Sequence, residues 1–456
     1  MPELPRDDLS RRIRAVQSEQ RLPALVGAVF QRGELVWSEA AGLANVEDER
    51  PVSVDDQFRV GSITKTFVAV AILQLRDEGA LALDDPVERH VTEVPHTGAT
   101  IRRLLAHASG LQREPVGNVW ATLELPDRDA FLASLAEVEQ VLAPGLAWHY
   151  SNLAFVLLGD VVGRLRGELP EEAIERTVLR PLGLERTSWL PLAPHAQGYL
   201  VEPWHDGVRR EHHVELGALA SLGQLWSTAG DLARWGDFLS EPDPAVLAAD
   251  TVQEMHALQA MADEKWRRGW GLGVALLRSG DRIFGGHGGA MPGFLASLTW
   301  ERESRTGSVV LTNSGANAPV EVLGLELADH AATAFAVEPK EWRPAGALPG
   351  ELDGVVGRWW SEGEEMILQL RGDELQVPAA KAGEAPSRLV REGVDRYRTA
   401  TGHFRGELLL VERDETGAAT KLWWGTYPLT REPETFAQED GAGGASPPPA
   451  PSPPAS

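Results

Sequence analysis

The stretch FRVGSITKTFVAVAILQL, from Phe58 to Leu75, is the point from which the rest of the chain is best interpreted. It predicts a short strand, a glycine turn, and an apolar helix over residues 64–77 that ends before Gly79. Ser62 and Lys65 open this helix, and no acidic residue in its first turns pairs with the lysine. Because the two residues are three positions apart, both side chains point to one face of the helix.

A serine and a lysine placed in this way can act as a nucleophile and its base. Unpaired backbone N–H groups and the dipole at a helix N-terminus stabilise a developing oxyanion. A buried amine can accept the serine proton if desolvation lowers its pKa from about 10.4 toward neutrality. Only five of the 43 basic residues are lysines, and arginine never loses its proton, so a lysine here favours a base. The alternative is a serine that caps the helix beside a lysine that extends into solvent.

Two further segments carry residues suited to the same chemistry. In PGLAWHYSNLAFVLLGDVVG, Tyr150 and Asn152 come just before an apolar helix, and a tyrosine that faces a lysine can shuttle a proton. The alternative is an aromatic staple with a serine or asparagine cap. In FGGHGGAMPGF, Phe284 to Phe294, glycines on a strand would let a substrate approach the backbone and receive an N–H bond. The alternative is a glycine-rich hairpin turn.

The order of the elements along the chain predicts two folded regions and a tail. A strand pair and helix, an all-helical middle at about 100–200, and a terminal strand set with a helix predict an α/β (α+β) domain over residues 1–338. Its sheet would be split in sequence by the helical insertion. Short alternating runs with turn signals predict a small antiparallel β-barrel over residues 348–435. Residues 436–456 are rich in Pro, Ala and Ser and are expected to be a disordered tail.

Composition excludes several classes of function. A formal net charge of −24 argues against nucleic acid or an anionic membrane as a partner, and the absence of cysteine excludes disulfides and thiolate chemistry. No apolar run is long enough to span a bilayer, and no signal peptide is visible, so we expect a cytoplasmic protein. No phosphate-binding loop, dinucleotide fingerprint or G-x-S-x-G elbow is present. We therefore expect no cofactor and a small-molecule substrate; the oligomeric state stays open.

Taken together, Ser62-x-x-Lys65, Tyr150-x-Asn152 and His287-Gly288-Gly289 resemble the motifs of the serine β-lactamase and penicillin-binding-protein superfamily. The order and spacing look most like the branch of class C β-lactamases and serine esterases, and LLAHASGL, Leu104 to Leu111, is similar to an element of that branch. The resemblance covers about residues 9–336. It implies a β-lactamase-like sheet flanked by helices. The region after about Leu348 resembles the lipocalin-like barrel of some members.

The resemblance also implies a role for each matching residue. Ser62 would be the nucleophile that forms an acyl-enzyme, Lys65 would activate it, and Tyr150 would pass a proton to the leaving group. Asn152 would hold a polar group of the substrate or Lys65. The N–H groups of Ser62 and Ala290 would form the oxyanion hole, beside the Gly288-Gly289 backbone. His287 stands where many members have lysine, and because neutral histidine has no fixed charge, it favours esters or amides without a carboxylate.

Three hypotheses for function follow. The first is an esterase or amidase on small acyl substrates; the second is a D-amino-acid peptidase, DD-carboxypeptidase or β-lactamase; the third is a non-catalytic binder or sensor. A positive residue near His287 would separate the first two, and the candidates are Arg209, Arg210, Arg267 and Arg268. Other histidines have plainer explanations: His107 is expected to be structural, and the histidines at 205, 212 and 213 to lie in a solvated loop rather than a metal site.

Overall fold

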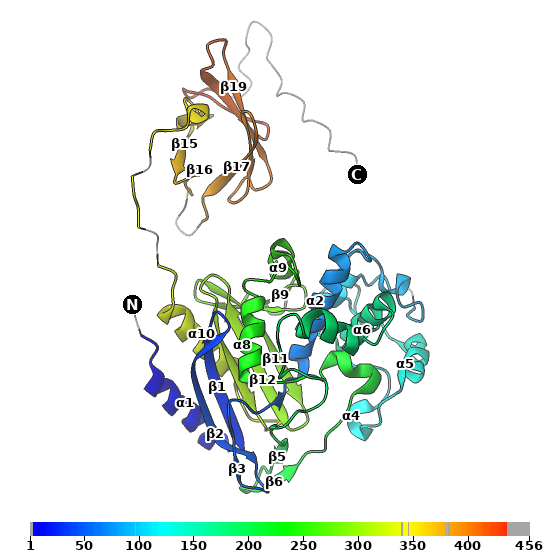
Figure 1. The fold of residues 1–456 in the computed structure, drawn as a ribbon. Helices are drawn as coiled ribbons and strands as arrows, with labels where there is room; N and C mark the ends of the chain where they lie inside the picture. Colours follow the sequence, from blue (N-terminus) through cyan, green and yellow to red (C-terminus); the bar gives the residue numbers. More distant parts are fainter. Residues whose placement is uncertain are drawn as a thin grey trace. The chain divides into compact units, whose positions relative to one another are not determined.

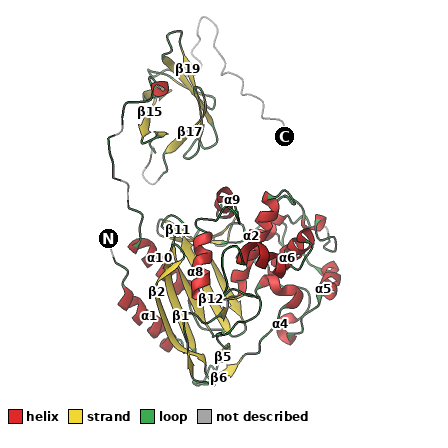
Figure 2. Cartoon of the chain, in the orientation of Figure 1, coloured by secondary structure: helices red, strands yellow, loops and turns green. Residues whose placement is uncertain are grey.

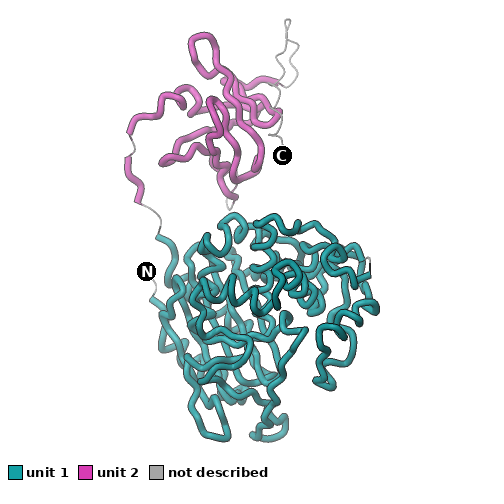
Figure 3. The backbone as a smooth tube through the Cα atoms, turned by 45° about the vertical axis from the view of Figure 1, so that its right-hand side comes forward, with its two compact units in different colours: residues 1–338 teal, residues 339–456 magenta. Residues whose placement is uncertain are grey.

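The computed structural model describes residues 3–95, 97–338, 341–344, 346–379, 381 and 384–435. The chain divides into two compact units, residues 1–338 and residues 339–456 (Figure 3). Each unit has its own sheet and its own hydrophobic core. The expected tail, residues 436–456, lies outside the described residues.

A nine-stranded antiparallel sheet forms the centre of the first unit (Figures 1 and 2). Its strand order is β3-β2-β1-β13-β12-β11-β10-β9-β8. The strands are β1 (Ala24–Gln31), β2 (Glu34–Asn45), β3 (Arg50–Pro51), β8 (Ala260–Met261), β9 (Arg268–Trp270), β10 (Ala275–Ser279), β11 (Arg282–Met291), β12 (Phe294–Glu301) and β13 (Thr306–Thr312). Pairing of β1 with β13, with Ala28 opposite Val309, joins the two ends of this unit's sequence. The prediction of a sheet split in sequence by helices is confirmed.

Helices cover both faces of this sheet (Figure 1). The helices α1 (Arg6–Glu19) and α10 (Val320–Ala334) pack on one face, where Ile13 and Leu327 are buried against Leu25. The others are α2 (Thr64–Asp77), α3 (Ile101–Leu105), α4 (Val119–Thr122), α5 (Arg128–Ser134), α6 (Asn152–Arg166), α7 (Pro170–Ile174), α8 (Ala229–Phe238) and α9 (Ala249–Met255). Short two-strand ladders join β4 (Phe58–Arg59) to β7 (Trp226–Ser227) and β5 (Tyr199–Val201) to β6 (Val208–Arg210). Within the described residues, no helix is long and apolar enough to cross a membrane.

The helix α2 is buried on all sides, between the sheet and the helical region. Phe67 stacks on Trp235 of α8 with ring centroids 3.9 Å apart, and the indole nitrogen of Trp235 donates to Thr66 Oγ1 at 2.8 Å. Residues from Thr64 to Leu75 are buried without exception. A helix that is apolar all round is stable only in a core. This packing fixes the N-terminus of α2, and with it Ser62, against the sheet.

The second unit is an eight-stranded antiparallel barrel that is nearly closed. The strands run in sequence order: β14 (Gly357–Ser361), β15 (Glu364–Arg371), β16 (Glu374–Val377), β17 (Ser387–Gly393), β18 (Arg396–Thr399), β19 (Leu408–Arg413), β20 (Ala419–Trp424) and β21 (Tyr427–Leu429). Trp360 and Thr430 exchange two backbone hydrogen bonds of 2.8 Å, which join the first strand to the end of the last. Trp359, Tyr397 and Trp424 are among the side chains that fill the interior. The predicted small antiparallel barrel is confirmed.

Candidate active site

Ser62 lies in a 3₁₀ turn, η1 (Gly61–Ile63), that presses directly on β11. A Cβ on Gly61, whose φ is +53°, would lie 2.6 Å from the Ala290 nitrogen. A Cβ on Gly289 would lie 1.9 Å from the Val60 oxygen. Only glycine fits at both positions, because a side chain would push the turn and the strand apart. The close approach brings the Ser62 hydroxyl beside the backbone of β11.

The structure brings Ser62, Lys65 and Tyr150 together. Lys65 is completely buried, and its Nζ lies 3.0 Å from Ser62 Oγ. The same Nζ also donates to the carbonyl oxygen of Leu222. The Tyr150 hydroxyl is hydrogen-bonded to Ser62. The α2 helix has no side-chain cap, so the alternative of a capping serine beside a solvent-exposed lysine does not describe this site.

The protonation states of these groups are set mainly by burial. Burial lowers the pKa of Lys65 to about 7, with Glu114 opposing that shift and Arg113 adding to it. Burial raises the pKa of Tyr150 above its usual range, although the hydrogen bond to Ser62 acts in the opposite direction. Near neutral pH the lysine can therefore accept a proton, while the tyrosine keeps its own and can donate it.

Tyr150 is held by His107 and by the start of α6. The two rings stack with centroids 4.1 Å apart, and His107 Nδ1 accepts the Ser151 N–H at 3.1 Å. Ser151 in turn caps α6 by accepting the Ala154 N–H at 3.1 Å. Burial and the nearby Lys65 hold the pKa of His107 well below its usual range. His107 is thus a neutral ring that supports the tyrosine, in agreement with the structural role expected from the sequence.

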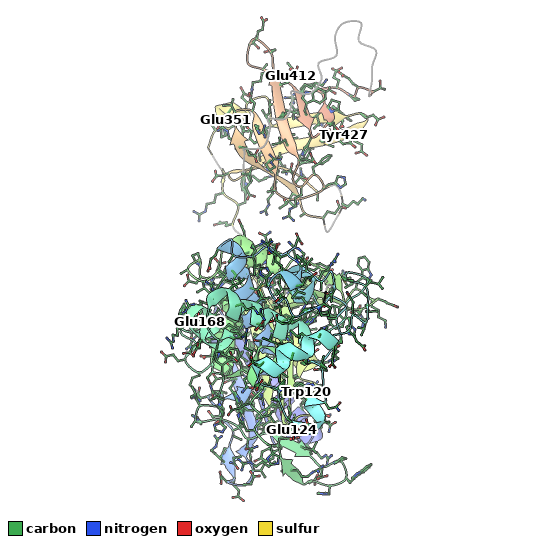
Figure 4. The ribbon with its side chains drawn as sticks, turned by 90° about the vertical axis from the view of Figure 1, so that its right-hand side faces the viewer. Trp120, Glu124, Glu168, Glu351, Glu412 and Tyr427 are labelled. Carbon is green, nitrogen blue, oxygen red and sulfur yellow. The ribbon has the colours of Figure 1, made fainter. Side chains whose placement is uncertain are left out.

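Asn152 contacts a carboxylate that the sequence analysis did not single out. Its Nδ2 donates to both oxygens of Glu114, at 2.8 and 3.0 Å, while its Oδ1 has no hydrogen-bond partner within the described part of the chain. Trp120 of α4, which is labelled in Figure 4, donates its indole N–H to the same carboxylate at 2.8 Å. The amide nitrogen of Asn152 therefore faces Glu114 rather than Lys65. The available signal was the charged pair Arg113-Glu114, two positions after the LLAHASGL segment.

His287 lies on β11 as a neutral ring that presents an acceptor. Its Nδ1 is 2.6 Å from the Gly288 carbonyl oxygen, and since a carbonyl only accepts, Nδ1 carries the proton. Its Nε2 is buried and has no hydrogen-bond partner among the residues that the structure describes. Burial, Lys65 and Arg268 together lower the pKa of His287 to about 3. This position therefore supplies no positive charge at neutral pH.

A cavity of about 550 Å³ opens in front of Ser62. Seven of the eight predicted site residues line it, and Lys65 lies behind Ser62. Residues that the sequence analysis missed also line it: Arg113, Trp148, Trp270, Val320 and Glu321. Among the four candidate arginines, only Arg268 is part of this lining, and Arg209 pairs with Glu202 at 2.7 Å. A larger hollow of about 1140 Å³ lies between the ends of α1 and α10, and the described residues that line it include no serine, histidine or lysine.

Within the part of the chain that the structure describes, no group of three or more His, Asp or Glu side chains could hold a metal ion. The cavity presents a serine hydroxyl, a protonated tyrosine and strand N–H groups, and a lysine with a pKa near neutrality lies directly behind the serine. This set of groups can support transfer of an acyl group through a serine ester.

The chain belongs to the beta-lactamase family. The profile described as Beta-lactamase matches residues 9–333, and a second, described as Domain of unknown function (DUF7586), matches residues 348–431. The family expected from the three motifs is thereby confirmed, and the named members include esterases and D-alanyl-D-alanine carboxypeptidases.

Individual proteins with known names or structures are also similar to this chain. Esterase EstB of Burkholderia gladioli is 37% identical over 207 residues, which cover 41% of this chain and 52% of that protein. Beta-lactamase-like protein 2 of Dictyostelium discoideum is 28% identical over 289 residues, covering 60% and 50%. The chain thus spans about half the length of these two relatives. The octameric penicillin-binding protein homologue from Pyrococcus abyssi shares the fold, with a TM-score of 0.65 at 23% identity over 93% of this chain and 99% of that one.

Proposed function

We propose that this protein is a serine hydrolase that cleaves small esters or amides through an acyl-enzyme on Ser62. One observation carries the proposal. Lys65 Nζ lies 3.0 Å from Ser62 Oγ, and burial lowers the pKa of this lysine to about 7. A lysine in that state can take the serine proton at neutral pH, which an ordinary surface lysine cannot do.

Acylation follows from the positions of these groups. Neutral Lys65 accepts the Ser62 proton as Oγ attacks the carbonyl carbon of the substrate. The resulting oxyanion faces the N–H groups of Ser62 and Ala290 at the contact between η1 and β11. When the intermediate collapses, the bond to the leaving group breaks and Tyr150 donates its proton to that group. The lysine ammonium returns a proton to the tyrosine, and water then hydrolyses the acyl-enzyme by the reverse transfers.

The cavity favours an uncharged substrate. His287 is neutral, and Trp148, Trp270, Leu295 and Val320 give the cavity an apolar lining. Apolar walls with a few polar groups are typical of sites for small molecules. The similarity to an esterase supports the same preference. We therefore propose esters or amides with an apolar acyl group as the substrate class.

A second candidate is favoured by two cations in the cavity. Arg113 and Arg268 both line it, and either could attract a substrate carboxylate, as a D-amino-acid peptidase, DD-carboxypeptidase or β-lactamase requires. Both guanidinium groups have a carboxylate partner: Arg113 Nε is 3.4 Å from Glu114, and Arg268 Nη1 is 3.1 Å from Glu321. Because each of these guanidinium groups is already paired with a carboxylate of the protein, an uncharged substrate remains our first proposal.

Steady-state hydrolysis of p-nitrophenyl butyrate and of benzylpenicillin tests both candidates. We expect measurable turnover of the ester, at a rate well above that of penicillin. Ser62→Ala should abolish turnover, while Ser18→Ala, on the exposed face of α1, should leave it unchanged. Penicillin turnover that exceeds ester turnover would move the proposal to the second candidate. Full ester turnover by the Ser62→Ala protein would refute both.

A further inference from the structure

An ion pair forms part of the wall of the cavity in front of Ser62. Arg268 Nη1 on β9 lies 3.1 Å from Glu321 Oε2 in the first turn of α10. Both residues line the cavity, yet they come from elements far apart in the sequence. The pair thus joins one edge of the sheet to the helix that packs on it.

The carboxylate of Glu321 rests directly on the backbone of β11. A Cβ on Gly288 would lie only 2.1 Å from Glu321 Oε1. This contact is one residue beyond His287 and two before Ala290, so the carboxylate stands beside the strand that a substrate would approach. A carboxylate group is already present in the cavity, and it belongs to the protein itself.

Arg268 is positioned to bind a carboxylate on the leaving-group side of Ser62. It lines the same cavity as Tyr150, the residue that would protonate the leaving group, and the ring of Trp270 lies 6.0 Å from the Tyr150 ring. Its guanidinium carbon lies 5.8 Å from the centre of the Trp270 ring. The Arg268 side chain is 34% exposed, so its guanidinium can make more bonds than Glu321 provides.

We propose that Glu321 is an internal carboxylate that occupies Arg268 and so excludes substrates with a carboxylate on their leaving group. This inference rests on the proposed function and specifies its substrate class. A substrate carboxylate would meet a like charge beside the strand and a guanidinium that is already paired. The Glu321 side chain is 47% exposed, so removal of its charge leaves a polar group with access to water rather than a buried gap.

Two esters that differ only in one charge test the proposal. They are the phenylacetyl ester of 3-hydroxybenzoate and the phenylacetyl ester of methyl 3-hydroxybenzoate. The measured quantity is the ratio of kcat/KM for the anionic ester to kcat/KM for the neutral ester, which cancels any general change in catalysis. Glu321→Gln should raise this ratio by about tenfold or more, the effect of one charge-assisted hydrogen bond gained. Adding Arg268→Gln to that variant should remove the gain.

A matched control lies on the same helix. Asp329 of α10 pairs with Arg282 of β11 at 3.1 Å and does not line the cavity. Asp329→Asn should leave the ratio unchanged. An unchanged ratio in Glu321→Gln would overturn the proposal, and so would a gain that persists when Arg268 is also replaced. If neither the wild-type protein nor any variant cleaves the neutral ester, the proposed function is refuted, and this inference, which rests on it, is refuted as well.

Discussion

Lowering the pH from 8.0 to 5.5 should slow acylation of Ser62 about 30-fold. With a Lys65 pKa of about 7, the lysine is about nine-tenths neutral at pH 8.0 and about 3% neutral at pH 5.5. Only the neutral lysine accepts the serine proton, so activity is lost as the pH falls through 7. A lysine with an ordinary pKa of about 10.4 would instead give a fall of about 300-fold and no plateau below pH 10.

The assay is the second-order rate of inactivation by a fluorophosphonate, with kcat/KM for a neutral ester measured in parallel. Neither reagent titrates between pH 5.5 and 9.5, so the profile reports groups of the free enzyme. Glu114→Gln removes a carboxylate that raises the pKa of Lys65, so the midpoint of this variant's pH–rate profile should move to lower pH. A rate that is flat from pH 5.5 to 8.0 would refute a lysine base, and a rate that rises tenfold per pH unit up to pH 10 would refute the lowered pKa of Lys65.

Three further substitutions test the catalytic base, the turn and the core. Lys65→Arg keeps a charge but cannot accept a proton, so kcat/KM for p-nitrophenyl butyrate should fall by about 1000-fold; retained activity would rule out the base. Gly289→Ala places a methyl group 1.9 Å from the Val60 oxygen, so it should lower both the melting temperature in calorimetry and the esterase rate. Gly230→Ala is the control: its Cβ would have its nearest neighbour at 3.9 Å, so both quantities should stay unchanged. Trp235→Ala should lower the free energy of unfolding in urea by about 3–5 kcal/mol, and a loss under 1 kcal/mol would mean that the ring stack is not part of the core.

The parts of the site that the sequence could predict are those set by short-range geometry. Ser62 and Lys65 share a face because they are three apart at a helix start, and the glycines around His287 mark a strand with close backbone contacts. The order of strands and helices along the chain also predicted a sheet that is split in sequence by a helical insertion. These inferences need only local periodicity, turn signals and known motifs.

The remaining site residues depend on contacts between distant segments. Glu321 reaches the cavity only because α10 packs on the sheet beside β11, and Arg268 reaches it from a three-residue strand. From the sequence, the expected partner of Asn152 is a polar group of the substrate or Lys65, whereas in the structure its amide nitrogen donates to Glu114 from another loop. No periodicity in the sequence encodes these distances, since they arise when helices and loops pack around the sheet.

Intact-mass measurement after incubation with excess fluorophosphonate, followed by peptide mapping, tests the central claim most directly. We predict a single adduct on the peptide that contains Ser62 and none in the Ser62→Ala protein. An adduct on another residue, or a wild-type protein that stays unlabelled at pH 8, would contradict a nucleophilic Ser62 activated by Lys65.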